Sequence, residues 1–454
     1  MRILLIFPPL SLDERYNANV GDVGGYLAPL GLCQMAAILL EDGHDVQVMD
    51  CPVNHYNLTD IIERVRQFQP GIVGVSAVTS LYDKTIKISE AIREKFPSIL
   101  VLIGGPHTKL SPEKILEETH ANIVLVGDAD ITIREIAKNK EKYMAPQVVH
   151  GEVVKDLDSL PYPARHLLDM SRYTAFPNNW KETPHVFQVM ATRGCAFHCT
   201  FCASANSNYR RRSVRHVIGE LKELKRDYDA KEVAFWDDIF TMKRDWVMEF
   251  CQALKEENIN LLWSCETRVH LVDPELLQAM KKAGCWNILF GIEAADQDLL
   301  NNIRKGTTPA AILKGVRMVQ DAGIEVRGTF MLGLPGETPE KAKRTIDFAV
   351  ELDCDYSQFT LCTPFPGTEL YLTADKWGSF VDKSHENQTE LSAVFVPHGY
   401  SSQEELRRLF KGAYRKFYLR PGYVYKRLKK IRTFSDIKRN VLGLRAILGF
   451  ADHW

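Results

Sequence analysis

The stretch RGCAFHCTFCASA, residues 193–205, places Cys195, Cys199 and Cys202 within eight residues. A structural zinc site needs a fourth Cys or His ligand, and His198 directly precedes Cys199, which makes it a poor ligand for the same ion. A disulfide would leave one of the three thiols unpaired. Iron–sulfur clusters are held by thiolates, and three ligands leave one iron with an open position, as catalytic metal sites do. The spacing therefore favours a catalytic iron–sulfur cluster.

The composition excludes several other classes of protein. The chain has 454 residues, with 57 basic against 58 acidic side chains and a net charge of −1, so we expect no nucleic-acid partner. No apolar run approaches the ~20 residues that a membrane-spanning helix needs, and the first apolar run, RILLIF, is better explained as a strand than as a signal peptide. The other cysteines lie singly in apolar patterns, as buried thiols do. We therefore expect a cytoplasmic protein.

Residues 1–140 alternate short apolar runs with amphipathic segments. The apolar runs are RILLIF, DVQVMD, GIVGVSAV, LVLIGG and IVLVGD. Strands this apolar are typical of parallel strands that are buried on both faces. The pattern predicts an α/β fold with a doubly wound, Rossmann-like parallel sheet, whose ligand binds at the carboxyl ends of the strands. The residues of interest at those ends are Ser76, Gly104, Gly105, His107 and Gly127.

Residues 141–185 are polar and contain prolines, and we predict a linker there. A second βα series follows over residues 186–380, with predicted helices near 214–227, 243–256, 273–283, 308–322 and 338–352. This series predicts a full or partial βα barrel, in which the active site forms at the carboxyl ends of the strands. The cysteine stretch follows the first barrel strand, and so lies at that end. Residues 381–454 predict a basic, helical C-terminal extension.

The C-x3-C-x2-C spacing, with Phe201 before the last cysteine, resembles the radical S-adenosylmethionine (SAM) superfamily, and the resemblance extends over the barrel. In that family the open iron of a 4Fe–4S cluster binds the amino and carboxylate groups of SAM. Reductive cleavage of SAM then gives a 5′-deoxyadenosyl radical that abstracts a hydrogen atom. The resemblance implies that the three cysteines hold the cluster, and that an electron donor such as flavodoxin or ferredoxin is a partner.

The same resemblance implies a set of SAM contacts. Glu293, in GIEAAD, would bind the amino group, although Ile292 stands where the family has a second glycine. Glu266 and Arg268, in SCETR, would bind the ribose and the carboxylate. The strand before GLPGET would contact adenine, as would the backbone at Phe201, and Arg304 is a weaker candidate for the carboxylate. The full set is Phe201, Glu266, Arg268, Glu293, Arg304 and Leu334.

Asp237 and Asp238 follow the second barrel strand, in AFWDDIFT. Paired carboxylates can do acid–base work or hold a metal. They can also cap the next helix and anchor the loops around SAM, and we favour this structural role.

The first domain resembles the cobalamin-binding domain of the cobalamin-dependent radical SAM subclass. By this resemblance Ser76, Gly104, Gly105, His107 and Gly127 would contact cobalamin. The signature Asp-x-His-x-x-Gly is absent, and NVGDVGGYLAPLG, residues 19–31, has no histidine in its place. Cobalt would then lack a protein imidazole. The alternatives are that the domain is a structural module without cofactor, and that His107 is simply exposed in its turn.

These features predict a cobalamin-dependent radical SAM enzyme that methylates an unactivated carbon of a small-molecule or lipid-like biosynthetic substrate. The alternative is a radical SAM cyclase, or an enzyme of rearrangement, dehydration or deoxygenation, whose cobalamin domain is vestigial or does not methylate. A non-catalytic carrier has no need of a complete set of SAM contacts. The basic tail suggests peripheral contact with a membrane or a lipid substrate. We favour the alternative, a helical lid over the substrate channel with a solvated basic face.

Overall fold

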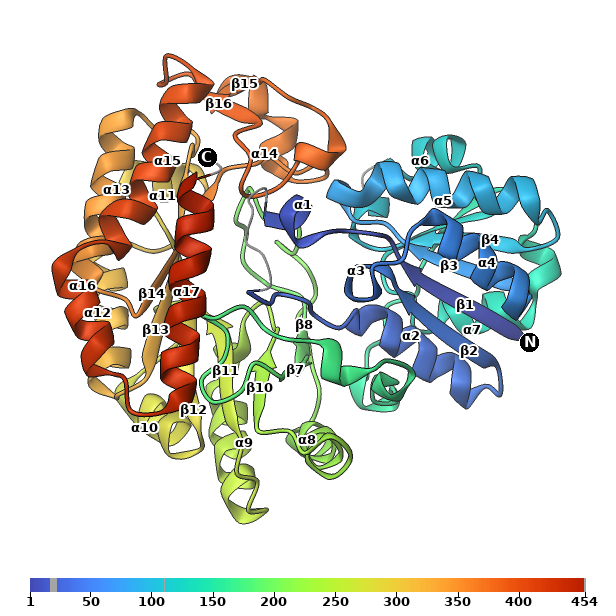
Figure 1. Ribbon diagram of the computed structural model, residues 1–454, viewed down its shortest axis with the longest axis horizontal. Helices are drawn as coiled ribbons and strands as arrows, with labels where there is room; N and C mark the ends of the chain where they lie inside the picture. Colours follow the sequence, from blue (N-terminus) through green and yellow to red (C-terminus); the bar gives the residue numbers. More distant parts are fainter. Residues whose placement is uncertain (17–22, 110, 453–454) are drawn as a thin grey trace. The chain divides into compact units, whose positions relative to one another are not determined.

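The structure is a computed structural model that describes residues 1–16, 23–109 and 111–452 (Figure 1). The described residues form two compact units. Unit 1 contains Met1–Arg15, Tyr26–Tyr173 and the short segment Ser384–Thr389, and unit 2 contains the remaining described residues. Within the part of the chain that is described, no helix has the length and apolar character that a membrane crossing requires.

Unit 1 is built on a six-stranded parallel sheet in the order β2-β1-β3-β4-β5-β6. Its strands are β1 (Arg2–Phe7), β2 (Asp45–Asp50), β3 (Ile72–Ser76), β4 (Leu100–Gly104), β5 (Ile123–Val126) and β6 (Gln147–His150). The longer helices are α2 (Leu30–Glu41), α4 (Leu58–Phe68), α5 (Tyr82–Lys95), α6 (Pro112–Thr119) and α7 (Thr132–Lys138), with short α1 (Leu12–Tyr16) and α3 (Cys51–Asn54).

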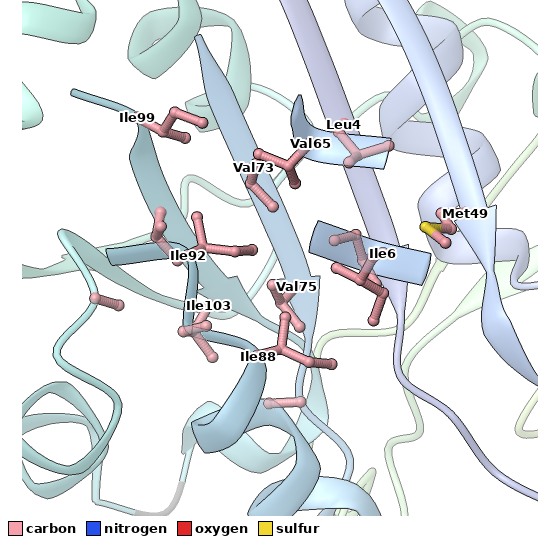
Figure 2. Close-up of a cluster of buried hydrophobic side chains, with 14 of the residues drawn as sticks. Leu4, Ile6, Met49, Val65, Val73, Val75, Ile88, Ile92, Ile99 and Ile103 are labelled. Atoms are coloured by element: carbon pink, nitrogen blue, oxygen red, sulfur yellow. The ribbon is translucent and has the colours of Figure 1, made fainter. Parts of the chain in front are cut away.

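Apolar side chains cover both faces of this sheet, because successive residues of a strand point to opposite sides. Leu4 and Ile6 of β1 pack with α4, α5 and α6 on one face, where Figure 2 shows the cluster around Val73 and Val75. Ile3 and Leu5 pack with α2 and α7 on the other face. The doubly wound sheet predicted from the apolar runs is confirmed.

The boundary of unit 1 differs from the predicted one. Residues 147–150, placed in the predicted linker, form β6, which pairs in parallel with β5. Unit 1 then continues to Tyr173, whose hydroxyl donates a hydrogen bond to Asp50 at 2.7 Å. Residues 141–173 of the predicted linker are thus part of the first unit, and residues 174–185 belong to the second.

Unit 2 contains a second parallel sheet, in the order β14-β13-β12-β11-β10-β7, with no pairing between β7 and β14. This is the partial βα barrel. Its strands are β7 (Val186–Val189), β10 (Glu232–Phe235), β11 (Leu262–Thr267), β12 (Cys285–Glu293), β13 (Glu325–Leu332) and β14 (Tyr356–Leu361). Its helices are α8 (Val214–Tyr228), α9 (Arg244–Glu256), α10 (Pro274–Lys282), α11 (Gln297–Asn302), α12 (Pro309–Asp321) and α13 (Pro339–Leu352).

The C-terminal extension covers the open edge of the barrel at β14. It contains β16 (Phe395–Pro397) and helices α15 (Gln403–Tyr418), α16 (Pro421–Lys429) and α17 (Phe434–Asp452). The segment before it contains α14 (Glu369–Leu372) and β15 (Gly378–Phe380), which pairs with β16. The hydroxyls of Tyr414 and Tyr418 each accept from one backbone N–H of β14 and donate to the carbonyl of the same residue, Phe359 and Ser357 respectively. These side chains satisfy edge groups that would otherwise invite another strand.

Candidate active site

The cysteine loop begins and ends at a small antiparallel pair, β8 (Thr192–Arg193) and β9 (Arg210–Arg211). Inside it, the Cys195 amide donates to Ser207 Oγ, and the Ser207 amide donates back to the Cys195 carbonyl, both at 2.9 Å. Gly194 has a φ of +88°, and a Cβ at this position would overlap the backbone of Asn208. The loop is therefore shaped by its own backbone.

The three thiols lie on this one loop, Cys195 and Cys199 buried and Cys202 half-buried. Burial raises the pKa of Cys195 and Cys202, and the nearby charges of Asp238 and Cys199 raise both further. Among the described residues, no three His, Cys, Asp or Glu side chains are close enough to bind a single ion. Cluster thiolates bind separate irons, and so need not converge on one point. The cluster at these cysteines stays a prediction, which a preformed loop supports.

Arg268, after β11, offers the clearest observation in favour of an anionic ligand. Its Nη1 lies 3.7 Å from Cys199 Sγ, and its Cζ lies 3.9 Å from the ring centroid of Phe197. The residue is 7% exposed, and its Nη2 is buried with no hydrogen-bond partner among the described residues. Because a buried guanidinium nitrogen without a partner is costly, this atom fits the predicted contact with the SAM carboxylate.

Glu293 ends β12 in a strained conformation. Its φ is +66°, rare for a residue other than glycine, and the pairing of β12 with β13 is irregular between Gly291 and Glu293. Its carboxylate forms an ion pair with Lys305 at 2.6 Å, and the two side chains are 7% and 10% exposed. A Cβ on Gly291 would lie 2.6 Å from Glu293 Oε1 and from Lys305 Nζ, so a larger residue here would displace the ion pair. Lys305 was not predicted from the sequence.

Two further charged residues, Arg327 and Glu390, interact with Glu266, whose side chain is partly exposed. Arg327 Nη2 lies 3.7 Å from Glu266 Oε1, and burial raises the pKa of Glu266 while Arg327 opposes the rise. The pKa of Glu390 is raised as well, by burial first and then by the charges of Glu293 and Glu266. The carboxylates predicted for the amino group and the ribose thus share one electrostatic environment. Arg327 and Glu390 were also missed.

The remaining predicted SAM residues have different surroundings. The ring of Phe201 is half-buried, and Lys305 Nζ lies 6.0 Å from its centroid. Leu334 is fully buried in the turn after β13. The exposed guanidinium of Arg304 pairs with Glu369 at 2.7 Å, whereas its carbonyl accepts a 3.8 Å contact from Cys199 Sγ. The part of Arg304 that reaches the cysteine loop is therefore its backbone.

The turn GLPGET is held by Glu337, which is completely buried. The Gly333 amide and the Tyr400 hydroxyl both donate to Glu337 Oε1, and the Glu337 amide donates to the Leu334 carbonyl at 2.9 Å. Burial raises the pKa of Glu337 from 4.5 to about 7, and the hydrogen bonds that its carboxylate accepts from Tyr400 and Gly333 oppose part of the rise. Glu337 therefore couples the turn to the C-terminal extension through Tyr400.

This raised pKa predicts a dependence of stability on pH. The folded protein holds the Glu337 proton more tightly than the unfolded chain, so the group stabilises the fold at low pH and loses that contribution as the pH rises to about 7. Glu337→Gln does not titrate. We expect it to gain about 2.5 kcal/mol of unfolding free energy relative to the native protein between pH 5 and pH 8, measured by urea denaturation. Glu340→Gln, at an exposed neighbour, is the control, and a constant difference for Glu337→Gln would contradict the prediction.

The two aspartates after β10 differ in their burial and in their contacts. Asp237 is buried and accepts hydrogen bonds from the amide and the hydroxyl of Thr192 at the start of the cysteine loop. Burial raises its pKa to about 7. Asp238 is exposed. The anchoring role favoured from the sequence fits Asp237, but neither aspartate caps α9, because that helix begins at Arg244 with Lys243 as its N-cap.

In unit 1, the residues predicted for cobalamin gather at the carboxyl ends of the strands. β2 and β3 lie on opposite sides of β1, which makes this edge the topological switch point where such sheets bind ligands. Ser76 pairs with Gly104, and a Cβ on Gly105 (φ +112°) would lie 2.7 Å from the Ala77 carbonyl. Gly127 follows β5 with a φ of +93°. Of the predicted His-free stretch 19–31, residues 19–22 lie outside the described part of the chain.

His107 is buried, at 5% exposed, so the alternative of an exposed histidine is wrong. Its ring centroid lies 4.2 Å from that of Tyr82 and 5.6 Å from that of His385, and its Nδ1 lies 3.1 Å from Thr79 Oγ1. Burial lowers its pKa to about 4, and His385 lowers it further. The sequence could not reveal this contact, because His385 comes from a segment far along the chain.

Comparison with known proteins supports the description of both the barrel and the first domain. Residues 189–349 match the model of the radical SAM superfamily, and residues 16–137 match that of the B12 binding domain. An uncharacterised methyltransferase of Pyrococcus horikoshii is 33% identical over 98% of both chains. A cytidylyl-2-hydroxyethylphosphonate methyltransferase of Streptomyces wedmorensis is 26% identical, over 93% of this chain and 91% of its own. An anaerobic magnesium-protoporphyrin IX monomethyl ester cyclase of Rubrivivax gelatinosus is also 26% identical, over 93% and 78%.

Among solved structures, the radical SAM methyltransferase TsrM of Kitasatospora setae, with cobalamin and a 4Fe–4S cluster bound, has a TM-score of 0.66 and 17% identity over 99% of each chain. This likeness concerns the fold. The relative at 33% identity and the two matched domains together decide the family. The chain belongs to the radical SAM superfamily, in the subclass that carries a B12-binding domain, and is an enzyme whose cofactors are a 4Fe–4S cluster, SAM and cobalamin.

Proposed function

We propose that the enzyme transfers a methyl group from SAM to an unactivated carbon of a small-molecule or lipid-like biosynthetic substrate. The observation that carries the proposal is the pairing of a B12 binding domain with a radical SAM domain in one chain that aligns over 98% of its length with a relative named as a methyltransferase. The Streptomyces wedmorensis relative, a named methyltransferase, supports the same choice.

When bound, the cluster and SAM supply the radical chemistry, and cobalamin carries the methyl group. The chain's own residues hold and orient these groups. We propose that the thiolates of Cys195, Cys199 and Cys202 bind the cluster, and that the buried Nη2 of Arg268 binds the SAM carboxylate. Glu293 would bind the SAM amino group as it now binds the ammonium of Lys305. A charge-assisted hydrogen bond suits each of these two contacts.

For cobalamin, we propose Ser76, Gly104, Gly105 and Gly127 as contacts at the switch point, with His107 shaping this edge from its packed position beside Tyr82. The sequence between β1 and α2 contains no histidine, so no imidazole from this stretch would bind cobalt. Holding cobalamin without a protein imidazole would be compatible with methyl transfer to a carbon radical.

Two further proposals concern the electron donor and the location of the enzyme in the cell. Reducing the cluster takes one electron at a time, so we propose flavodoxin or ferredoxin as the electron donor. A cytoplasmic location also remains a proposal. It is supported by the ten cysteines, all of them free thiols, because reducing compartments keep thiols unpaired.

The proposal is tested by incubating the reconstituted protein with a reductant, cobalamin and SAM whose methyl group is trideuterated, together with a metabolite extract from cells that make the protein. Methylation predicts S-adenosylhomocysteine, 5′-deoxyadenosine and a metabolite whose mass rises by one trideuterated methyl group. If 5′-deoxyadenosine forms alone, and a metabolite changes without the label, the enzyme is a cyclase or an enzyme of rearrangement or elimination, and methyl transfer is wrong. Omitting cobalamin is the control, which should remove the labelled product.

A further inference from the structure

Helix α17 carries an apolar stripe that faces solvent. Its members are Phe434, Ile437, Val441, Leu444 and Leu448, which are 80%, 47%, 54%, 51% and 48% exposed. The spacing of three and four residues places them along one side of the helix. Apolar residues at this spacing normally face a protein core. Here the stripe is exposed over most of a 19-residue helix.

Helix α17 lies against the rest of unit 2 (Figure 1), and side chains opposite the stripe hold it there. Arg439 is 3% exposed and donates to the Trp180 carbonyl at 3.1 Å, and Leu442 packs against the cluster that contains Trp180. Ala446 is also buried. The helix is therefore held by a different set of residues, and the apolar stripe points away from the fold that holds it.

Cations flank the stripe. Lys438 and Arg445 are exposed, and each directly follows a member of the stripe. Neither makes an ion pair with any described residue. Of the nine Lys and Arg residues from Arg420 to Arg445, two are buried and three pair with Asp353 or Asp355. The exposed cations without an ion pair to any described residue are Lys429, Arg432, Lys438 and Arg445. This part of the surface thus combines apolar side chains with a local excess of exposed positive charge, although the whole chain is close to neutral.

This combination of apolar and basic side chains favours one kind of binding partner over another. A second copy docked through the same stripe would bring two basic surfaces together, which like-charge repulsion opposes. An anionic lipid surface accepts both features, because the apolar side chains enter the acyl boundary while Lys and Arg meet the headgroups. We propose that α17 docks the enzyme on the surface of an anionic phospholipid bilayer, through the stripe together with Lys438 and Arg445.

The docking surface lies apart from the candidate active site. Arg439 of α17 lies 5.8 Å from the ring of Trp286, near the start of β12, whereas the cysteine loop and Glu293 follow the carboxyl ends of barrel strands. A helical lid would lie at that carboxyl end, so the contacts of α17 do not support the lid that we favour from the sequence. Bilayer binding and SAM cleavage can therefore be measured independently, and the inference holds whether or not the enzyme methylates its substrate.

The test is sedimentation of the full-length protein with vesicles of phosphatidylcholine containing about one third phosphatidylglycerol, against vesicles of phosphatidylcholine alone. We expect binding to the anionic vesicles that weakens as salt is added. Val441→Asp/Leu444→Asp and Lys438→Glu/Arg445→Glu should each weaken it about ten-fold or more. Lys314→Glu/Lys343→Glu makes the same change of charge at exposed sites on α12 and α13, and should bind like the native protein.

Each variant should keep the native rate of 5′-deoxyadenosine formation and the native unfolding curve, because all the substituted side chains are exposed. Equal binding by the stripe variants and the native protein would overturn the proposal, as would no binding to anionic vesicles at low salt. Sedimentation velocity without lipid tests whether a second copy of the chain covers the stripe. A native dimer that Val441→Asp/Leu444→Asp converts to a monomer would show that a second copy covers the stripe instead.

Discussion

Cys199→Ala is expected to lose the cluster and to reduce SAM cleavage by about a thousand-fold or more, as when the group that starts a reaction is removed. Cys199 is the central thiol of the loop, where its Sγ contacts both the Arg268 guanidinium and the Arg304 carbonyl. Two thiolates cannot replace three, because each cluster thiolate binds its own iron. The measurements are iron and sulfide per chain after anaerobic reconstitution, and the rate of 5′-deoxyadenosine formation.

The matched control is Cys251→Ala. Cys251 is also buried, at 5% exposed, but lies in α9 and makes no part of the cysteine loop. This variant should be somewhat less stable, because it leaves a small cavity, and yet retain a full cluster. A full cluster in Cys199→Ala, or equal cluster loss in both variants, would show that the loop does not bind the cluster in the way we propose.

The fold could be predicted largely from the sequence because its strands are unusually apolar. IVGVS and LVLIG form β3 and β4 in the buried middle of the first sheet, where both faces select aliphatic side chains. Strand β6 was not predicted, because the opposite conditions hold there. It is a four-residue edge strand, QVVH, with no fully buried residue, and its polar surroundings resemble a linker.

The candidate site was predictable only where its residues are close in sequence or follow a strand. The three cysteines and Glu293 meet these conditions. Lys305, Arg327 and Glu390 do not, because their importance comes from ion pairs and charge interactions with Glu293 and Glu266 that the fold creates. A lysine twelve residues after a glutamate is unremarkable in a sequence. What marks it is its burial beside that glutamate, whose backbone at the end of β12 is strained.

Glu293→Gln and Lys305→Met are expected to act in opposite directions on SAM binding. Glu293→Gln keeps the size of the side chain but removes the charge, so we expect SAM affinity to fall about a hundred-fold, together with 5′-deoxyadenosine formation. It also leaves the ammonium of Lys305 buried without its partner, which costs about 3–5 kcal/mol of folding stability. Calorimetric titration of the cluster-loaded protein with SAM and urea unfolding measure the two effects separately.

Lys305→Met removes the ammonium that occupies Glu293 at 2.6 Å. The amino group of SAM would then meet no competitor, so SAM affinity should stay the same or increase, even though the protein without SAM loses stability. The double variant Glu293→Gln/Lys305→Met should regain stability without regaining affinity, because neither buried charge remains. If Lys305→Met instead weakens SAM binding as much as Glu293→Gln, the ion pair itself is part of the bound site. The two side chains would then hold SAM jointly. The hypothesis that the amino group of SAM replaces the ammonium of Lys305 at Glu293 would be wrong.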